Sequence, residues 1–108
     1  MMNNCLIAFK NMNWESPALG VRQKVHIEGK QKIRLVEFSE EFEEKDWCMS
    51  GHVGYVLEGK MSVDFNGEMI DFKAGDGLFV PKGEAHKHKA MIAKGDKVLI
   101  VLFEVLAL

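Results

Sequence analysis

The sequence predicts an all-β protein of about eight to ten short strands, and three observations support this class. Short strand-like runs alternate with glycine-containing turns along the chain, without a repeat, a low-complexity tract or a linker. Residues 61–72 carry a strong hairpin signal. Period-two patterns of apolar and polar residues recur on both sides of it. Strands at this spacing favour a sandwich or a small closed barrel, which hides its strand edges.

Composition limits the classes of function. The chain has 108 residues, which is enough for one domain with its own core and too few for two. Its 47% apolar and 28% charged residues are typical of a soluble globular protein. The net charge is -2 and the lysines are scattered, whereas phosphate binding needs a concentrated basic surface. We therefore expect one domain over residues 1–108 that binds no nucleic acid.

No segment predicts a membrane or secretory signal. The longest uninterrupted apolar run, residues 98–103, is far shorter than the ~20 residues that span a bilayer. Residues 1–10 lack the basic lead and the longer apolar stretch of a signal peptide. We expect a cytoplasmic protein with no membrane partner. In a reducing compartment a lone disulfide is unusual, so Cys5 and Cys48 are expected as thiols.

The first half of the chain predicts an edge strand and then a hairpin. Residues 11–20 contain Pro17 and have the character of an irregular lead or edge strand. Residues 22–28 and 31–38 flank a Gly-Lys turn and predict two paired strands. The acidic run 37–46 has no spaced ligand pattern and predicts a solvated loop or a single helical turn.

The hairpin at residues 61–72 is the clearest local structure. Asn66-Gly67 is the strongest short hairpin signal, because both turn residues need positive φ. A two-residue turn fixes the register and places most apolar groups on one face. The predicted opposed pairs are Phe65 with Glu68, Val63 with Ile70, and Met61 with Phe72.

The last third of the chain holds two histidines in a strand-like pattern. A tight turn at residues 74–77, an apolar run closed by Pro81 and a final strand at 97–105 surround them. His86 and His88 alternate with two lysines, and lysine is almost never buried unpaired. Period-two alternation therefore predicts that both imidazoles point inward. The alternative is a pair of core histidines satisfied by backbone carbonyls or water.

Two sequence motifs resemble those of the cupin superfamily. Residues 75–86 match the second cupin motif, G-(X)5-P-X-G-(X)2-H-(X)3-N, at every position but the last, where Ala90 replaces asparagine. Residues 52–59 resemble the end of the first motif, G-(X)5-H-X-H-(X)3,4-E-(X)6-G, with Gly59 as its closing glycine. The resemblance covers residues 45–92. It implies a cupin-type jelly-roll β-barrel (double-stranded β-helix), with a core barrel at residues 21–106, in a family that commonly forms homodimers.

The first motif departs from the family at its metal ligands. Counting back from Gly59 places His52 where the family has its glutamate. The shorter spacing then places Asp46 and Cys48 where the family has paired histidines. With His86 from the second motif, the resemblance implies a carboxylate, a thiol and two imidazoles that converge from neighbouring strands. This donor set favours a divalent transition metal, zinc first and iron second, over magnesium or calcium.

Other roles for these residues stay open at this point. His88 either replaces Asp46 as the fourth ligand or orients a molecule in a ligand pocket. A cupin that has lost its metal would keep Cys48 as an inert core thiol. A Cys48–His52 nucleophilic dyad would need an orienting group and oxyanion donors, which the spacing does not specify.

The predicted function is binding of one metal ion and a small organic ligand inside the barrel. Cupins include isomerases, oxygenases and binding modules without catalysis, so the resemblance leaves open whether the chain is an enzyme. In an enzyme, an open metal position would polarise a carbonyl or activate water or dioxygen, with His88 as a proton carrier. The alternative is a non-catalytic binding or sensor cupin without metal.

Overall fold

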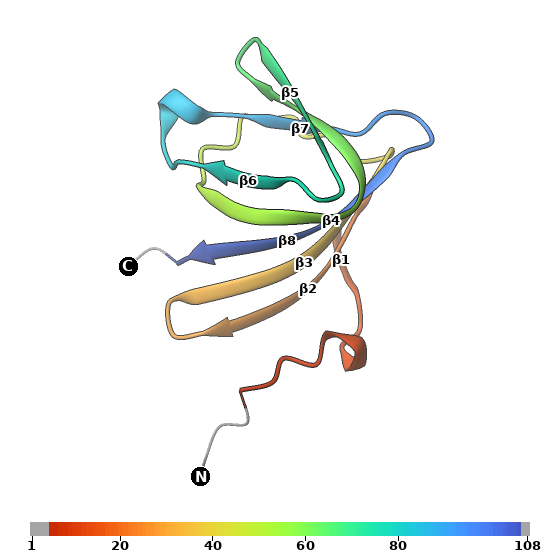
Figure 1. The fold of residues 1–108 in the computed structure, drawn as a ribbon, viewed down its shortest axis with the longest axis vertical. Coiled ribbons are helices and arrows are strands. Elements are labelled where there is room, and N and C mark those ends of the chain that lie inside the picture. Colours follow the sequence, from red (N-terminus) through yellow and green to blue (C-terminus); the bar gives the residue numbers. More distant parts are fainter. Residues whose placement is uncertain (1–4, 107–108) are drawn as a thin grey trace.

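A computed structural model describes residues 5–106, which form an antiparallel β-sheet that curls around an interior (Figure 1). The predicted all-β class is confirmed. Residues 1–4 and 107–108 of the predicted domain lie outside the described residues. The elements are η1 (Phe9–Asn11), β1 (Glu15–Ala18), β2 (Val21–Glu28), β3 (Gln31–Ser39), β4 (His52–Phe65), β5 (Glu68–Lys73), β6 (Gly77–Val80), η2 (Glu84–His86), β7 (Lys89–Met91) and β8 (Lys97–Val105). Within the described part of the chain, no helix has the length and apolar character needed to cross a bilayer.

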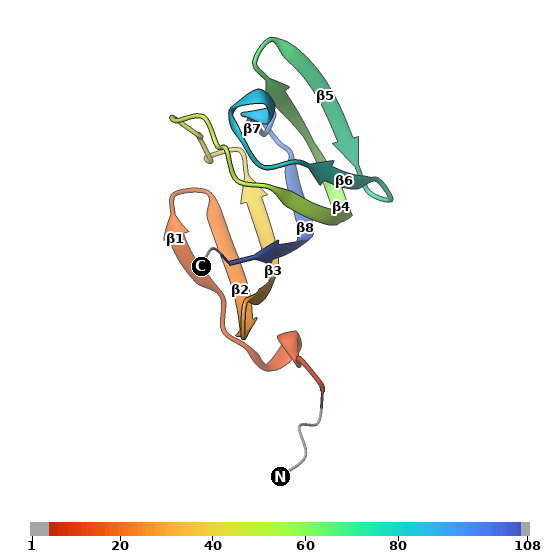
Figure 2. The ribbon, with the colours of Figure 1, turned by 90° about the vertical axis from the view of Figure 1, so that its left-hand side faces the viewer.

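The strand order runs β1-β2-β3-β8-β4-β5, and β6 and β7 also pair with β4. The 14-residue strand β4 pairs with more strands than any other strand of this arrangement. Its first part pairs with β6 and β8, and its second part pairs with β5 and β7. The turned view shows how β4 carries the sheet from one side of the barrel to the other (Figure 2). The N-terminal segment with η1 extends away from the barrel in both views.

A β-bulge allows β4 to serve both parts. The register with β8 shifts between Val56 and Glu58, so the inward side chains change from even to odd numbers. Val56 is buried before the bulge, and Met61 and Val63 are buried after it. Gly59 follows the bulge with φ of +78°, and a Cβ there would collide with the carbonyl oxygen of Lys97. The closing glycine of the first motif is therefore a steric requirement of the bend.

The hairpin at residues 61–72 has the predicted register. Asn66 and Gly67 have φ of 56° and 108°, as the two-residue turn requires. The observed pairs include Phe65 with Glu68, Val63 with Ile70, and Met61 with Phe72. The β2–β3 hairpin and the edge strand β1 are also present as predicted. Of the acidic run 37–46, predicted as a loop or helical turn, residues 37–39 belong to β3 and residues 40–46 form a loop.

The core lies inside the curled sheet and comes mainly from its central strands. Val36, Val56, Val98 and Ile100 are fully buried. On β8 the buried positions alternate with half-exposed or exposed ones through Leu102. The next residue on this inward face is Glu104, so the apolar alternation of β8 ends in a carboxylate that faces the same way.

Candidate metal centre

Cys48, His52 and His88 bring their side chains together inside the barrel. One ligand atom from each lies within 4.8 Å of the other two. Cys48 Sγ is 3.7 Å from His52 Nε2. The rings of His52 and His88 are 5.3 Å apart, centre to centre, and nearly perpendicular. The structure thus gathers three of the residues that the sequence singled out.

Backbone pairing places Cys48 beside His88. The Cys48 amide donates to the His88 carbonyl oxygen at 2.9 Å, and the His88 amide donates to the Cys48 carbonyl oxygen at 3.0 Å. Residues directly opposed in an antiparallel pair project their side chains to the same face. His52 comes from the start of β4, where it is paired with Val80 of β6. Two neighbouring segments therefore supply the cluster.

His86 does not point inward, which corrects the prediction from alternation. It is exposed at the end of η2, whereas His88 is buried. Gly83 has φ of 125°, and the amides of His86 and Lys87 close a 3-10 turn onto Gly83 and Glu84. Period-two alternation holds only in extended backbone, so it begins after this turn. His88 therefore takes the inward position that the second motif assigns to His86.

Asp46 also lies outside the cluster. It is exposed in the loop before Cys48, and the chain bends at residue 46. In a regular strand, Asp46 and Cys48 would share a face, but the bend removes that relation. Neither Asp46 nor His86 belongs to the group of converging ligand atoms.

Each histidine of the cluster is oriented by a second partner. His52 Nδ1 lies 2.9 Å from a carboxylate oxygen of Glu104, and His88 Nδ1 lies 3.0 Å from the carbonyl oxygen of His86. A carbonyl or an ionised carboxylate only accepts hydrogen bonds, so both Nδ1 atoms carry a proton. In a neutral ring the lone pair then sits on Nε2. This is the arrangement that outer hydrogen bonds impose on metal-binding histidines.

Glu104 is held in place by cations from β3. Arg34 donates to both of its oxygens, at 3.0 and 2.9 Å, and Lys32 Nζ lies 3.8 Å away. Sequence reasoning missed Glu104, although it follows Val98, Ile100 and Leu102 at a spacing of two residues. A carboxylate that continues an apolar face was the available signal, but its partner Arg34 lies 70 residues earlier in the chain.

The charges of this network follow from its contacts. Burial opposes protonation of His52, but hydrogen bonds with Cys48 and Glu104 outweigh it and raise the His52 pKa to about 9. Burial also opposes ionisation of Glu104, and the bonds from His52 and Arg34 lower its pKa to about 2. The hydrogen bond from His52 lowers the pKa of the Cys48 thiol against the effect of burial. Without metal, a proton is therefore held between Cys48 and His52.

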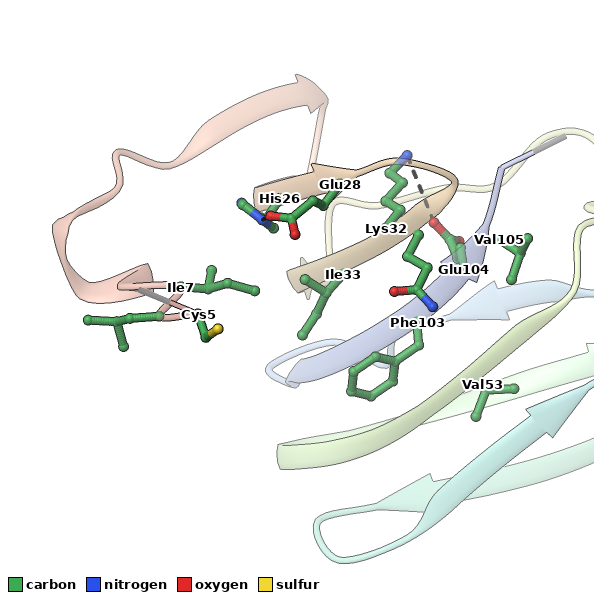
Figure 3. A pocket seen from close by; sticks show the side chains of 12 residues that line it. Cys5, Ile7, His26, Glu28, Lys32, Ile33, Val53, Phe103, Glu104 and Val105 are labelled. Carbon is green, nitrogen blue, oxygen red and sulfur yellow. Dashed lines mark hydrogen bonds and ion pairs between the residues drawn. The ribbon is translucent and has the colours of Figure 1, made fainter. Parts of the chain in front are cut away.

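A cavity of about 250 Å³ inside the barrel opens beside the cluster. Cys48, His52 and His88 line one part of its wall, together with Arg34 and Glu44. The remaining wall is apolar and aromatic. A larger pocket of about 580 Å³ lies between residues 5–7 of the N-terminal segment and the outer face of β2, β3, β8 and β4 (Figure 3).

The donor set fits a transition metal. Tetrahedral zinc with Zn–S of ~2.3 Å and Zn–N of ~2.0 Å would separate the two ligand atoms by about 3.5 Å. The observed separation between Cys48 Sγ and His52 Nε2 is 3.7 Å. One thiol and two imidazoles are also the donors that zinc and other borderline ions prefer. Three protein ligands would leave a tetrahedral ion one position for water or a small molecule, as in catalytic zinc sites.

A curled antiparallel sheet with a Cys/His/His cluster inside places the chain in the class of small β-barrels with polar groups in the interior. The family model described as "Cupin domain" matches residues 49–103, which is 55 of the 108 residues. The chain therefore belongs to the cupin superfamily, and the fold predicted from the two motifs is confirmed as a cupin β-barrel. Among curated proteins, none matches this sequence significantly.

Solved structures share the fold. The polyketide cyclase RemF from Streptomyces resistomycificus is 18% identical with a TM-score of 0.80, over 99% of this chain and 81% of that one. An RmlC-like cupin from Shewanella frigidimarina is 18% identical with a TM-score of 0.74, over 98% and 93%. KdgF from Halomonas sp. is 21% identical with a TM-score of 0.72, over 91% and 92%. At these identities the likeness establishes the fold and no activity.

Proposed function

We propose that this chain binds one divalent transition metal ion through Cys48, His52 and His88, with zinc as the first choice and iron as the second. The observation that carries the proposal is the orientation of the two imidazoles. Each donates its Nδ1 proton to an outer acceptor, His52 Nε2 lies 3.7 Å from Cys48 Sγ, and one ligand atom of His88 lies within 4.8 Å of a ligand atom of each. Of the roles that the sequence left open for His88, this proposal takes that of a metal ligand in place of Asp46.

The cavity beside the cluster supports binding of a small organic molecule in the same site. When bound, the ion would supply a Lewis acid that polarises a carbonyl or activates water or dioxygen. The protein's own contribution is positional. Glu104 and Arg34 fix the orientation of His52, and the apolar wall limits the access of water to the site. We propose a metal-dependent reaction of the isomerase or oxygenase type.

One observation favours a second candidate, a binding or sensor cupin that works without metal. Among the described residues, every buried side-chain nitrogen and oxygen has a hydrogen-bond partner without any ion. The network of Cys48, His52 and Glu104 is therefore complete as a purely polar core. Metal content decides between the two candidates.

The test is a zinc competition titration with a chromophoric chelator, together with metal analysis of protein purified without added metal. We expect one equivalent per chain in the wild type and a loss of at least 100-fold in affinity for Cys48→Ser and His52→Ala. Cys5→Ser is the matched control, because Cys5 is exposed and outside the cluster. If the wild-type protein stays metal-free after reconstitution, the proposed metal site is refuted and the metal-free binding or sensor cupin is favoured.

We also propose a homodimer, formed through the outer face of the sheet. Cross-strand pairing aligns Phe79, Val53, Phe103 and Ile33 in one row over β6, β4, β8 and β3. Phe79 is 77% exposed and Phe103 is 49% exposed. Figure 3 shows Ile33, Phe103 and Val53 on neighbouring strands of this face.

Such a contiguous apolar row is self-complementary in a two-fold interface. Sedimentation equilibrium should give a dimer for the wild type and a monomer for Phe103→Glu. A monomeric wild type at micromolar concentration would contradict the dimer. The cytoplasmic location and the absence of a membrane partner stay predictions.

A further inference from the structure

The apolar part of the cavity wall consists of aromatic and aliphatic side chains. Four of the seven phenylalanines of the chain line it, at positions 38, 42, 65 and 72. The ring centres of Phe38 and Phe42 lie 4.5 Å apart with the rings tilted by 31°, and the ring centre of Phe65 lies 5.7 Å from that of His88. An aromatic wall therefore extends to the edge of the Cys/His/His cluster.

The polar groups of the wall already have protein partners. Arg34 donates three hydrogen bonds, two to Glu104 and one to Gln23. A carboxylate oxygen of Glu44 accepts the Ala90 amide at 2.8 Å. These hydrogen bonds connect the loop to the strands, and the atoms of Arg34 and Glu44 that form them are not available to a ligand. A ligand with many hydroxyl groups would have to break them or leave its own groups unpaired, and each unpaired group costs about tenfold in affinity.

The volume of the cavity and the charges of its wall limit the class of ligand further. A cavity of about 150 Å³ is enough to hold benzene, so 250 Å³ accommodates one ring with small substituents. Among the charged side chains that line the cavity, Arg34 and Glu44 cancel, and a divalent ion with the Cys48 thiolate would add one positive charge. A neutral ligand whose hydroxyl loses its proton at the metal would balance this charge.

We propose that the ligand is a small neutral ring compound, aromatic or alicyclic, with a single hydroxyl or carbonyl oxygen directed at the cluster. The inference rests on the proposed metal site for the role of that oxygen. The apolar body packs against the phenylalanine wall, and the one polar atom meets the only part of the wall where three donor atoms converge in the described residues. Sugars and other polyols are excluded by the same wall.

The test is calorimetric titration of zinc-loaded protein with 4-methylphenol and with xylose, a neutral polyol of similar size. We expect 4-methylphenol to bind at least tenfold more tightly than xylose. Equal affinity, or preference for xylose, overturns the assigned ligand class. Benzoate serves as the charged probe, and benzoate binding more tightly than 4-methylphenol overturns its neutral character.

A pair of variants locates the binding site. Phe42→Ser changes the cavity wall from the loop after β3, whereas Leu19→Ser changes an exposed apolar side chain that does not line the cavity. We expect Phe42→Ser to weaken 4-methylphenol binding about tenfold and Leu19→Ser to leave it unchanged. The opposite order overturns the placement in the cavity. If Phe42→Ser fails to fold, the probe comparison on wild-type protein still decides.

Failure of this inference is separable from failure of the metal site. Cobalt-loaded protein should show a change in its visible absorption when 4-methylphenol binds, because the oxygen enters the coordination sphere. Metal loading without 4-methylphenol binding refutes the ligand class and leaves the metal site intact. Binding of 4-methylphenol to a protein that never loads metal refutes the metal site and keeps the apolar ligand.

Discussion

Replacing Glu104 with glutamine should remove a defined part of the acid sensitivity of the metal-free protein. The Glu104 pKa falls from 4.5 to about 2 because His52 and Arg34 donate to its carboxylate against the cost of burial. A shift of this size corresponds to at most about 3 kcal/mol of folding stability. The Glu104 side chain is only 15% exposed, so little of this is lost to solvent screening.

The sign follows from the depressed pKa. The stabilisation is present above the unfolded-state pKa of 4.5 and is lost as the pH falls through about 2. About 2 kcal/mol of it should be lost between pH 6 and pH 3 in the wild type. The glutamine in Glu104→Gln keeps an oxygen that accepts the His52 proton but carries no charge. The folding stability of this variant therefore lacks the loss that Glu104 causes between pH 6 and pH 3. The stability gap between the two proteins should therefore shrink as the pH falls.

Urea unfolding of metal-free protein at pH 6, 4.5 and 3 measures this gap, with reductant and chelator present. Glu37→Gln is the matched control, because Glu37 also pairs with an arginine, Arg22, at 2.8 Å, but that arginine is half-exposed. We expect the control to cost less than about 1 kcal/mol at pH 6. Parallel profiles for wild type and Glu104→Gln would refute the electrostatic role assigned to Glu104.

Two further predictions concern the thiols and the bulge. Zinc should protect Cys48 from iodoacetamide, whereas exposed Cys5 should react with or without metal; equal reaction of Cys48 in both states contradicts the assigned ligand. Gly59→Ala should destabilise the fold by at least about 3 kcal/mol, because its Cβ would strike Lys97, whereas Gly29→Ala, with similar φ and open space, should cost about 1 kcal/mol. Similar unfolding midpoints for the two glycine variants would contradict the claim that a Cβ at position 59 collides with Lys97.

Local rules in the sequence were sufficient for the all-β class, and the two motifs that resemble the cupin family were needed to predict the barrel. Asn66-Gly67 determines its own turn and register, and the spacing of the glycines and Pro81 in the second motif reflects the bends of a cupin barrel. Cys48 and His52 could be singled out by counting back from Gly59. The bulge before that glycine shows why the count is meaningful, since it fixes which residues of β4 face inward.

The same rules failed where the backbone leaves the strand conformation. The side chain of His86 points outward and that of His88 points inward because a 3-10 turn ends at His86. This turn depends on two backbone hydrogen bonds, and period-two alternation in the sequence does not predict it. Asp46 was misplaced by a bend in a loop. Glu104 could have been found as an inward carboxylate on β8. Its link to His52 and Arg34 depends on strand order, which no local pattern reveals.

The assignment of the metal ligands is tested by the zinc affinity of His88→Ala compared with that of His86→Ala, measured on proteins purified and reconstituted in the same way. The two histidines lie two residues apart, yet one is buried in the cluster and the other is exposed. We predict a loss of at least 100-fold for His88→Ala and an unchanged affinity for His86→Ala. An equal loss in both variants, or a loss in His86→Ala alone, would contradict the assignment of the metal centre.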